Sequence, residues 1–407
     1  MTEIRYPYGG KPTWEHTAIG LHLKPAEHHT DWLGDAETRA YELGVLKRIR
    51  AGWATMMTGG DSAIEVIAGK EAVRWLLDEQ IVPIFRDSTG KLPYPYPNIK
   101  FVEKLVPIYA EYGLRPLVIP WNEPGDDREW AGGEVPPDWK ERFLPLWIDA
   151  AKQITNAGAN VAFPDPLSEW QWWFERFPAD IMQMFRDGRA VVAAHLYGKN
   201  RPVNYPYDDV SQNGTPLTEA EWRAALGNFW DVPGYREVTL EYMNQQRREL
   251  AWLGKTFHDD ATCFGAWRNI YYAAEQAWGF RPVMCMTEGG WTPKDIPGSG
   301  PNNDYRWPVT TPAAIRDHTR QVLETQSEHG MFALTFWICY GWSYDGWYRN
   351  PLAGIHYDCF EYPRCYEQPV IHSLEDAPIL PGPTPGENLW GEVRAEFEAL
   401  RALIAES

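Results

Sequence analysis

The sequence has little of what would direct a chain to nucleic acid or to a membrane. It contains 38 basic against 56 acidic residues, a net charge of −18, and no basic block stands out from that average. A field of this sign repels polyanions, which argues against nucleic acid or an acidic membrane as the main partner. The uncharged stretch His329–Tyr344 is shorter than the ~20 apolar residues of a membrane-spanning helix.

The cysteines and glycines form no cofactor motif. The five cysteines include no CxxC pair, no GxGxxG follows the first apolar run, and GxxxxGKS/T is absent, so we expect neither a metal nor a cofactor. Cys285 and Cys339 lie in apolar runs and are predicted to be buried thiols, whereas Cys359 and Cys365 could form a disulfide bond in an oxidising compartment. The first residues lack the apolar run of a secretory signal, so residence in the cytoplasm is expected.

What the sequence has in excess is aromatic residues. It holds 22 Trp, 21 Tyr and 15 Phe, 14% of the chain, which is more large rings than a core alone requires. Flat aromatic faces with polar edges stack on sugar rings, whose C–H patches are apolar while their hydroxyls are not. Many of these rings are expected in the core, and the remainder favour a carbohydrate ligand.

Short apolar runs alternate with segments of helical periodicity along the chain. Each run reads as a strand buried on both faces, as parallel strands are, and each is followed by a helix or a long loop. This pattern predicts an α/β fold, a (β/α)8 or TIM barrel, with an open doubly wound sheet as the alternative. The eight predicted strands are Ala18–Leu23, Trp53–Thr58, Ile81–Phe85, Pro116–Pro120, Asn160–Phe163, Ala190–Ala194, Pro282–Thr287 and Met331–Trp337.

One catalytic domain is expected over residues 1–407, with long loop insertions after the sixth and eighth strands at about 199–260 and 338–386. Single helices are predicted over Ser168–Asp187 and Thr311–Glu328, and a closing helix over Glu387–Ala405. The insertions carry many aromatic residues, which predicts a cleft or pocket for an oligosaccharide. Those of the first insertion are Tyr205, Tyr207, Trp222, Trp230, Tyr235 and Trp252.

Two glutamates directly follow strongly apolar runs. Glu123 ends LVIPWNE and Glu288 ends VMCMTE, so in a barrel both are expected at the mouth formed by the carboxyl ends of the strands. A glutamate at the end of a buried strand is costly unless it is hydrogen-bonded or used. Two convergent carboxyl groups are what glycosidic bond cleavage needs, one to donate a proton and one to attack the sugar or activate water.

The segments Trp121–Pro124 and Thr287–Trp291 together resemble glycoside hydrolase clan A, which includes the family 5 cellulases and mannanases and the family 39 xylosidases. The resemblance implies a (β/α)8 barrel and a retaining β-glycosidase that cleaves oligo- or polysaccharide through a glycosyl-enzyme intermediate. It covers the whole barrel in topology but only about a dozen residues in detail. It also implies that Glu123 is the general acid/base and Glu288 the nucleophile.

By the same resemblance further residues would bind the substrate. Asn122 would hydrogen-bond the sugar 2-hydroxyl, and His195 and Tyr197 resemble the clan's His-x-Tyr element, in which Tyr197 would hold the nucleophile ionised. Trp337 resembles the tryptophan beneath the reacting sugar. The other candidates are Arg86, which could pair with Glu288, Asp87 or Asp165, then His22 near the pocket, and Trp291 and Trp342 as stacking faces.

Two neighbouring carboxyl groups cannot both ionise freely, so one proton is held more tightly. With donors from Tyr197 or Arg86, Glu288 is expected to ionise first and Glu123 to keep its proton longer. Two other classes of function stay open. One is an inactive barrel that only binds glycans, as an adhesin or scaffold. The other is a metal-dependent hydrolase using His22, His195 and Asp165, which lacks the usual HxH pair.

Overall fold

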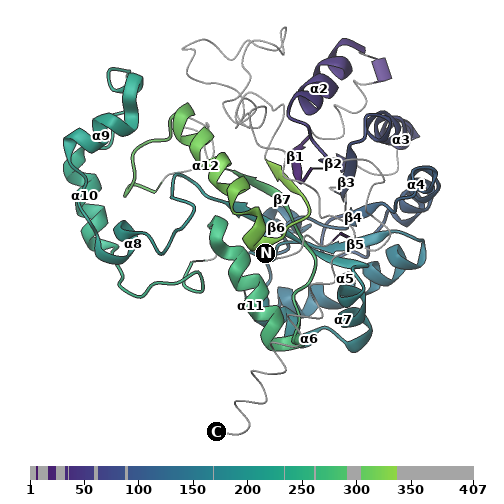
Figure 1. The fold of residues 1–407 in the computed structure, drawn as a ribbon. Helices are drawn as coiled ribbons and strands as arrows, with labels where there is room; N and C mark the ends of the chain where they lie inside the picture. Colours follow the sequence, from purple (N-terminus) through teal and green to yellow (C-terminus); the bar gives the residue numbers. More distant parts are fainter. Residues whose placement is uncertain are drawn as a thin grey trace, which may run out of the picture.

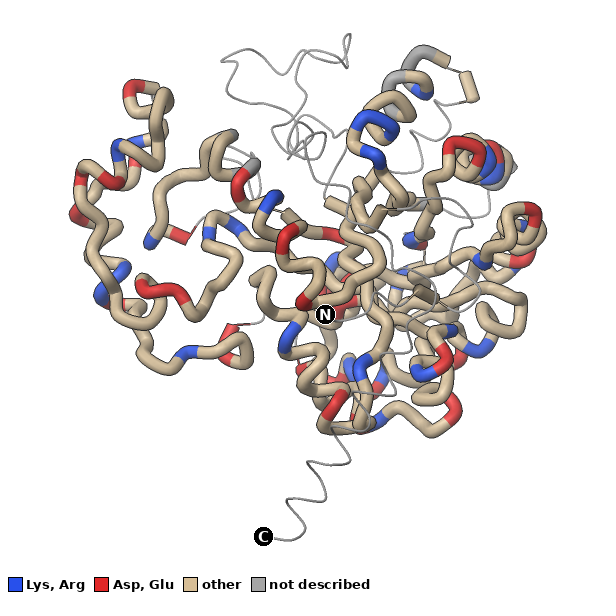
Figure 2. The backbone as a smooth tube through the Cα atoms, viewed as in Figure 1, with Lys and Arg blue, Asp and Glu red and all other residues tan. Residues whose placement is uncertain are grey.

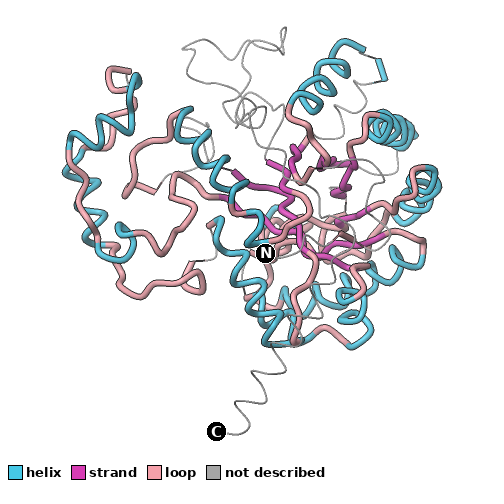
Figure 3. The backbone as a smooth tube through the Cα atoms, viewed as in Figure 1, coloured by secondary structure: helices cyan, strands magenta, loops and turns pink. Residues whose placement is uncertain are grey.

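A computed structural model of the chain describes residues 6–7, 17–23, 33–34, 36–58, 63–87, 90–167, 169–232, 234–260, 263–290 and 304–336. Eight parallel strands close into a barrel in the order of the sequence, because β1 pairs with both β2 and β8. The strands stand at the centre with helices around them (Figure 1; Figure 3). The expected (β/α)8 barrel is therefore confirmed, and the open sheet is wrong.

The strands are short and almost wholly buried, which is why their sequences are apolar on both faces. β8, the last of the eight strands along the chain, closes the barrel by pairing with Ile19, Gly20 and Leu21 of β1. The strand bounds are β1 (Ile19–His22), β2 (Trp53–Thr58), β3 (Val82–Asp87), β4 (Leu117–Ile119), β5 (Asn160–Phe163), β6 (Ala190–Tyr197), β7 (Met284–Gly290) and β8 (Leu334–Phe336).

Most helices bury one face against the barrel and expose the other. Along α5, for example, Phe143, Trp147, Ala150 and Ile154 are buried at helical spacing. The α-helices are α2 (Ala36–Arg48), α3 (Ala63–Asp78), α4 (Ile99–Glu111), α5 (Trp139–Asn156), α6 (Trp170–Arg176), α7 (Ala179–Arg186), α8 (Asp209–Asn213), α9 (Glu219–Leu226), α10 (Leu240–Glu249), α11 (Trp267–Trp278), α12 (Pro312–Glu324) and α13 (Gln326–His329).

Two helices predicted as single are divided in the structure. The segment Ser168–Asp187 forms α6 and α7, because Pro178 keeps Phe177 extended and then starts the second helix. The segment Thr311–Glu328 divides at Thr325 into α12 and α13. Strands β3, β6 and β7 run two to three residues beyond their predicted ends, so residues assigned to loops lie within strands.

The segment between β6 and α11 carries α8, α9 and α10, which lie to one side of the barrel (Figure 1). It has a small apolar cluster of its own that includes Trp222, Trp230, Tyr235 and Met243. Trp222, Trp230 and Tyr235 are largely buried in this cluster, whereas Tyr207 and Trp252 are 47% and 55% exposed. That this segment helps to bind an oligosaccharide stays a prediction. In α6, Trp170, Trp173 and Phe174 are buried in the core, and the partly buried Trp172 packs against it.

A buried network of charges attaches this segment to the residues before α12. Asp304 accepts hydrogen bonds from Arg201 Nε (2.9 Å) and from Arg306 Nη2 (2.7 Å). Asp260 accepts from Arg201 Nη1 (2.9 Å) and Tyr205 Oη (2.7 Å). Burial raises the pKa of the Asp304 carboxyl, but Arg306 and Arg201 outweigh it and hold that pKa below its ordinary value.

We expect Asp304→Asn to lower the free energy of unfolding by about 2 kcal/mol at pH 7, because a buried charge-assisted acceptor is lost. A carboxyl with a depressed folded pKa stabilises above its unfolded pKa and loses that contribution as pH falls through the folded value. The difference between the variant and the wild type in urea unfolding should therefore shrink below about pH 4. The exposed Asp231→Asn is the control, and a difference that persisted at low pH would contradict this account.

Some of the other predicted features lie in the described part of the chain and some lie outside it. Cys285 is a buried thiol as predicted, whereas Cys339, Cys359, Cys365 and the closing helix lie outside the described residues. Within the part of the chain that the structure describes, no helix is long and apolar enough to cross a membrane. Acidic and basic positions are interspersed along the helices (Figure 2). The single-domain organisation stays a prediction.

Candidate active site

Five of the candidate residues meet where the strands end. Arg86 lies in β3, Glu123 follows β4, His195 and Tyr197 lie in β6, and Glu288 lies in β7. Because all strands are parallel, their carboxyl ends open on the same side of the barrel. One carboxylate oxygen of Glu123, one of Glu288 and a ring nitrogen of His195 lie within 4.8 Å of one another. The expected convergence of the two glutamates is therefore present.

A β-bulge turns Glu288 toward this site. Ala194 pairs with Met286, but the next residue of β6, His195, pairs with Glu288, so Thr287 is an extra residue in β7. In a regular strand Glu288 would share the face of Met286, because residues two apart point the same way. The bulge instead puts Glu288 on the face of His195 and Tyr197. Bulges commonly redirect a side chain beside an active site.

The Glu288 carboxylate is held by a cation and a phenol. The Arg86 guanidinium forms an ion pair with Oε1, and Tyr197 Oη donates a hydrogen bond to Oε2 (2.5 Å). Both Arg86 and Glu288 are buried, with 4% and 5% of their surfaces exposed. Both partners favour the charged form of the carboxylate. Of the three partners open to Arg86 from the sequence, Glu288 is the one it ion-pairs in the structure.

We expect Arg86→Met to lower the free energy of unfolding at pH 7 by about 3 kcal/mol, because it leaves the buried Glu288 carboxylate without its cation. The double variant Arg86→Met/Glu288→Gln should recover much of that loss, since the pair is then uncharged. Urea unfolding of the single and double variants measures the coupling. A single variant as stable as the wild type would show that the ion pair does not hold Glu288 in solution.

Glu123 has a different set of neighbours. Its Oε1 lies 2.6 Å from His195 Nδ1, and Arg128 Nη2 is 3.7 Å from Oε2. Burial raises the pKa of the Glu123 carboxyl, but His195, Arg86 and Arg128 outweigh it and hold the pKa below its ordinary value. That Glu288 ionises before Glu123 stays a prediction, and it took no account of a histidine in direct contact with Glu123.

Asn122 lies beside Glu123 in the chain, whereas His22 is outside the group of residues at the strand ends. Asn122 Nδ2 donates to Glu129 Oε1 (3.2 Å), in the short 3-10 turn η1 (Asp127–Glu129) that follows Glu123. Its Oδ1 is buried and has no hydrogen-bond partner among the described residues, so it is available to a substrate hydroxyl. His22 is fully buried, and its Nδ1 lies 2.7 Å from the Leu23 carbonyl oxygen. It does not belong to the group formed by Glu123, His195 and Glu288.

The loop that carries Glu123 is anchored by Trp121. This ring is fully buried and packs edge-on against Tyr96 (5.8 Å between centroids) and Phe143 (5.7 Å). A turn follows at once, in which the Asp126 amide donates to the Glu123 carbonyl (2.9 Å). The Trp–Asn–Glu–Pro segment thus combines a packed ring with a tight turn, which fixes the carboxyl between them.

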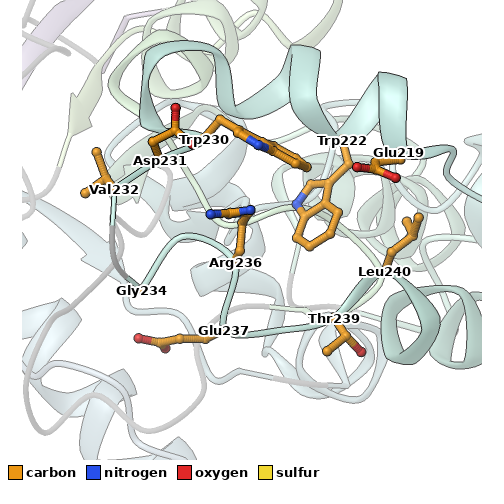
Figure 4. Close-up of a pocket in the computed structure, with 10 residues that line it drawn as sticks. All are labelled: Glu219, Trp222, Trp230, Asp231, Val232, Gly234, Arg236, Glu237, Thr239 and Leu240. Carbon is orange, nitrogen blue, oxygen red and sulfur yellow. The ribbon is translucent and has the colours of Figure 1, made fainter.

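Other candidate residues lie outside the described part of the chain. These are Trp291, Trp337 and Trp342, together with the second predicted insertion. A cavity of about 680 Å³ opens in the α9–α10 segment, where Arg236 lies over Trp230 at 4.9 Å (Figure 4). This cavity belongs to the segment beside the barrel. Trp222 and Trp230 line it, whereas Glu123, His195 and Glu288 do not.

Two neighbours of the site were not predicted from the sequence. Arg128 is an exposed side chain in η1, and nothing in its sequence context distinguishes it. Asp165, noted only as a possible ion-pair partner or metal ligand, is buried beside His195. The signal that could have found Asp165 is its position between two prolines immediately after β5.

No protein-family model matches the sequence, and no curated protein matches it. The fold is similar to that of a family 5 xyloglucanase from Paenibacillus pabuli (9% identity, 82% of this chain and 88% of that chain covered, TM-score 0.45). It is also similar to a family 5 cellulase from an Icelandic hot spring isolate (9%, 94% and 97%, 0.49). A family 1 β-glucosidase from Thermotoga maritima is a third (10%, 82% and 89%, 0.40). At these identities the chemistry has to be argued from this chain's own residues.

Proposed function

We propose that this protein is a retaining glycoside hydrolase that cleaves β-linked oligo- or polysaccharide. The observation that carries the proposal is the meeting of Glu123 and Glu288 from β4 and β7, with carboxylate oxygens within 4.8 Å of each other in a buried site. The resemblance of Trp121–Pro124 and Thr287–Trp291 to clan A agrees with it. The aromatic content of the chain suits a sugar ligand.

The separation of the two carboxylates supports retention of configuration. Retaining enzymes have carboxyl groups about 5–5.5 Å apart, whereas inverting enzymes need about 6.5–9.5 Å to admit a water molecule between sugar and base. The nearest oxygens of the two groups lie at most 4.8 Å apart, a close approach that favours the first range over the second. Direct attack by one carboxylate on the sugar is therefore the better-supported mechanism.

In the first step Glu288 attacks the anomeric carbon, and the bond from that carbon to the glycosidic oxygen breaks. A proton passes from Glu123 to the departing oxygen, so the leaving group departs as an alcohol. Arg86 and Tyr197 hold Glu288 ionised for the attack. The product is a glycosyl ester of Glu288, and Glu123 is then a carboxylate.

In the second step a water molecule attacks the same carbon from the side the leaving group vacated. Glu123 takes one proton from the water, and the ester bond to Glu288 breaks to restore its carboxylate. Two inversions give net retention. Asn122 Oδ1, buried and without a partner among the described residues, suits the sugar 2-hydroxyl, a contact that strengthens in the transition state.

His195 can hold the proton that Glu123 donates. Because its Nδ1 lies 2.6 Å from Glu123 Oε1, a proton can pass directly between the ring and the carboxyl. The proton can rest on the ring and return to Glu123 when negative charge develops on the leaving oxygen. A Glu123 carboxyl that ionises readily in the free protein is therefore compatible with its role as the acid.

A panel of aryl β-glycosides together with β-glucan, mannan and xylan polymers tests the function, each assayed with and without a chelator. Proton NMR should show the β-anomer as the first sugar released, with rates unchanged by the chelator. Release of the α-anomer first would make the enzyme inverting. Loss of activity with the chelator would favour a metal held by Glu123, His195 and Glu288. Glycan binding without hydrolysis by pure protein would favour the inactive binder.

A further inference from the structure

The backbone hydrogen bonds between β5 and β6 end before the part of β6 that carries His195. Pairing between β5 and β6 ends at Phe163 and Val192, three residues before His195. The next residues are Pro164, Asp165 and Pro166. Prolines have no N–H to donate, and a residue before proline is kept extended. The backbone of this loop therefore cannot continue the ladder alongside the end of β6.

The Asp165 side chain takes over that role. Its Oδ2 accepts the backbone N–H of His195 (2.8 Å), and its Oδ1 accepts the N–H of Leu167 (2.7 Å). Only 5% of Asp165 is exposed. Leu167 has a positive φ of 63°, an unfavourable conformation for a leucine, and the hydrogen bond from its N–H to Asp165 helps to hold it. One carboxylate thus joins the loop after β5 to the end of β6.

The residue that Asp165 holds stands between the two glutamates. His195 Nδ1 lies 2.6 Å from Glu123 Oε1 and 3.6 Å from Glu288 Oε2. The backbone of His195 is also where the ladder from β6 to β7 shifts register. The pairing of His195 with β7 is irregular at this point. A fixed hydrogen bond from the β5 side is therefore needed to keep the imidazole in place relative to the two carboxylates.

We propose that Asp165 is a positioning residue, which fixes the His195 backbone so that the imidazole stays between Glu123 and Glu288. The proposal rests on the proposed glycosidase function for its catalytic consequence. Asp165 itself does not touch the reacting atoms. It acts through His195, and therefore on the proton that His195 shares with Glu123.

The charge of Asp165 adds to its position. Burial raises the pKa of its carboxyl to about 6, against the opposing effects of His195 and of the two backbone N–H groups. Above that pH the ionised carboxylate is a charged acceptor for the His195 N–H, and below it this hydrogen bond weakens. The charged and titratable groups facing His195 and Glu123 are Arg86 from β3, Arg128 from η1, Asp165 after β5, Tyr197 from β6 and Glu288 from β7.

The test is Asp165→Asn, with the exposed Asp149→Asn on α5 as a matched control. Asparagine keeps the shape but has one acceptor oxygen for two N–H donors and carries no charge. We expect kcat/KM for glycosides with poor leaving groups to fall about 10- to 100-fold, because a small displacement of a proton-transfer group is costly. For activated leaving groups, which need no acid, kcat/KM should fall less than about 3-fold. The high-pH limb of the rate profile should move.

A measurement independent of activity separates this proposal from the proposed function. With ¹⁵N-histidine labelling, and with His195→Gln to assign the signals, the His195 ring resonances and their titration should change in Asp165→Asn and not in Asp149→Asn. If the wild type hydrolyses no glycoside, the proposed function fails, while the ring signals still decide whether Asp165 positions His195.

Unchanged ring signals, leaving-group dependence and pH profile in Asp165→Asn would overturn the positioning role. A folded Asp165→Asn is itself part of the expectation, so a variant that fails to fold would count against the proposal and make Asp165 a structural residue. Asp165→Glu then gives an independent check, since it keeps a carboxylate but moves it. It should show the same selective loss on poor leaving groups.

Discussion

Glu288→Gln is expected to reduce turnover by about 10⁴-fold or more on every substrate, whatever its leaving group. The amide keeps the size of the side chain but cannot attack the anomeric carbon, so no glycosyl ester forms. The loss should appear equally with an activated aryl glycoside and with a natural oligosaccharide. Steady-state kinetics on both substrates, after circular dichroism has shown the variant to be folded, measures the effect.

The control for Glu288→Gln is Glu103→Gln, an exposed residue of α4, which should keep wild-type activity. Added azide should not accelerate Glu288→Gln with retention, because the group that would carry the sugar is missing. If Glu288→Gln kept more than a few per cent of activity, Glu288 would not be the nucleophile.

Glu123→Gln should instead give a loss that depends on the leaving group. For poor leaving groups kcat/KM should fall about 10²- to 10⁴-fold, the usual contribution of a general acid. For activated leaving groups kcat/KM should change little, since bond breaking needs no proton. Turnover of those substrates should still slow, because no base activates water in the second step. Azide, which needs no base, should restore it.

The pH profile of Glu123→Gln offers a second reading. The wild-type profile of kcat/KM should be bell-shaped, with activity lost at high pH when the proton that Glu123 passes to the leaving group is gone. Glu123→Gln should lose that high-pH limb on activated substrates and keep the low-pH limb. A variant equally impaired on all leaving groups, or one that azide does not rescue, would contradict the assignment of Glu123 as the acid/base.

The barrel could be predicted from the sequence because its signals are local. Each strand is a short apolar run buried on both faces, and each of the first seven is followed by a helical segment. The division of Ser168–Asp187 was missed although Pro178 marks it, because the apolar spacing on either side suits one helix equally well. Helix boundaries depend on such single residues, whereas strand burial is repeated eight times.

The convergence of Glu123 and Glu288 was predictable for a similar reason, and the contacts around them were not. Glu123 and Glu288 each end a buried strand, and parallel topology brings such ends together. The contact of His195 with Glu123 depends on a side-chain direction that no periodicity encodes. This contact helps to hold the pKa of the Glu123 carboxyl below its ordinary value. Asp165 was visible as a polar strand end, but its two backbone partners depend on the exact path of the loop.

The extra residue Thr287 has a consequence for any redesign of this barrel. Thr287 changes which side chains at the end of β7 face into the barrel. The orientation of Glu288 therefore depends on the number of residues before it in the strand as well as on the identity of the side chain. If β7 were replaced by a regular strand with a glutamate at position 288, the carboxylate would point outward, toward the helices. Alignments used to transfer chemistry between such barrels should therefore be anchored at His195 and Glu288, not at the start of the strand.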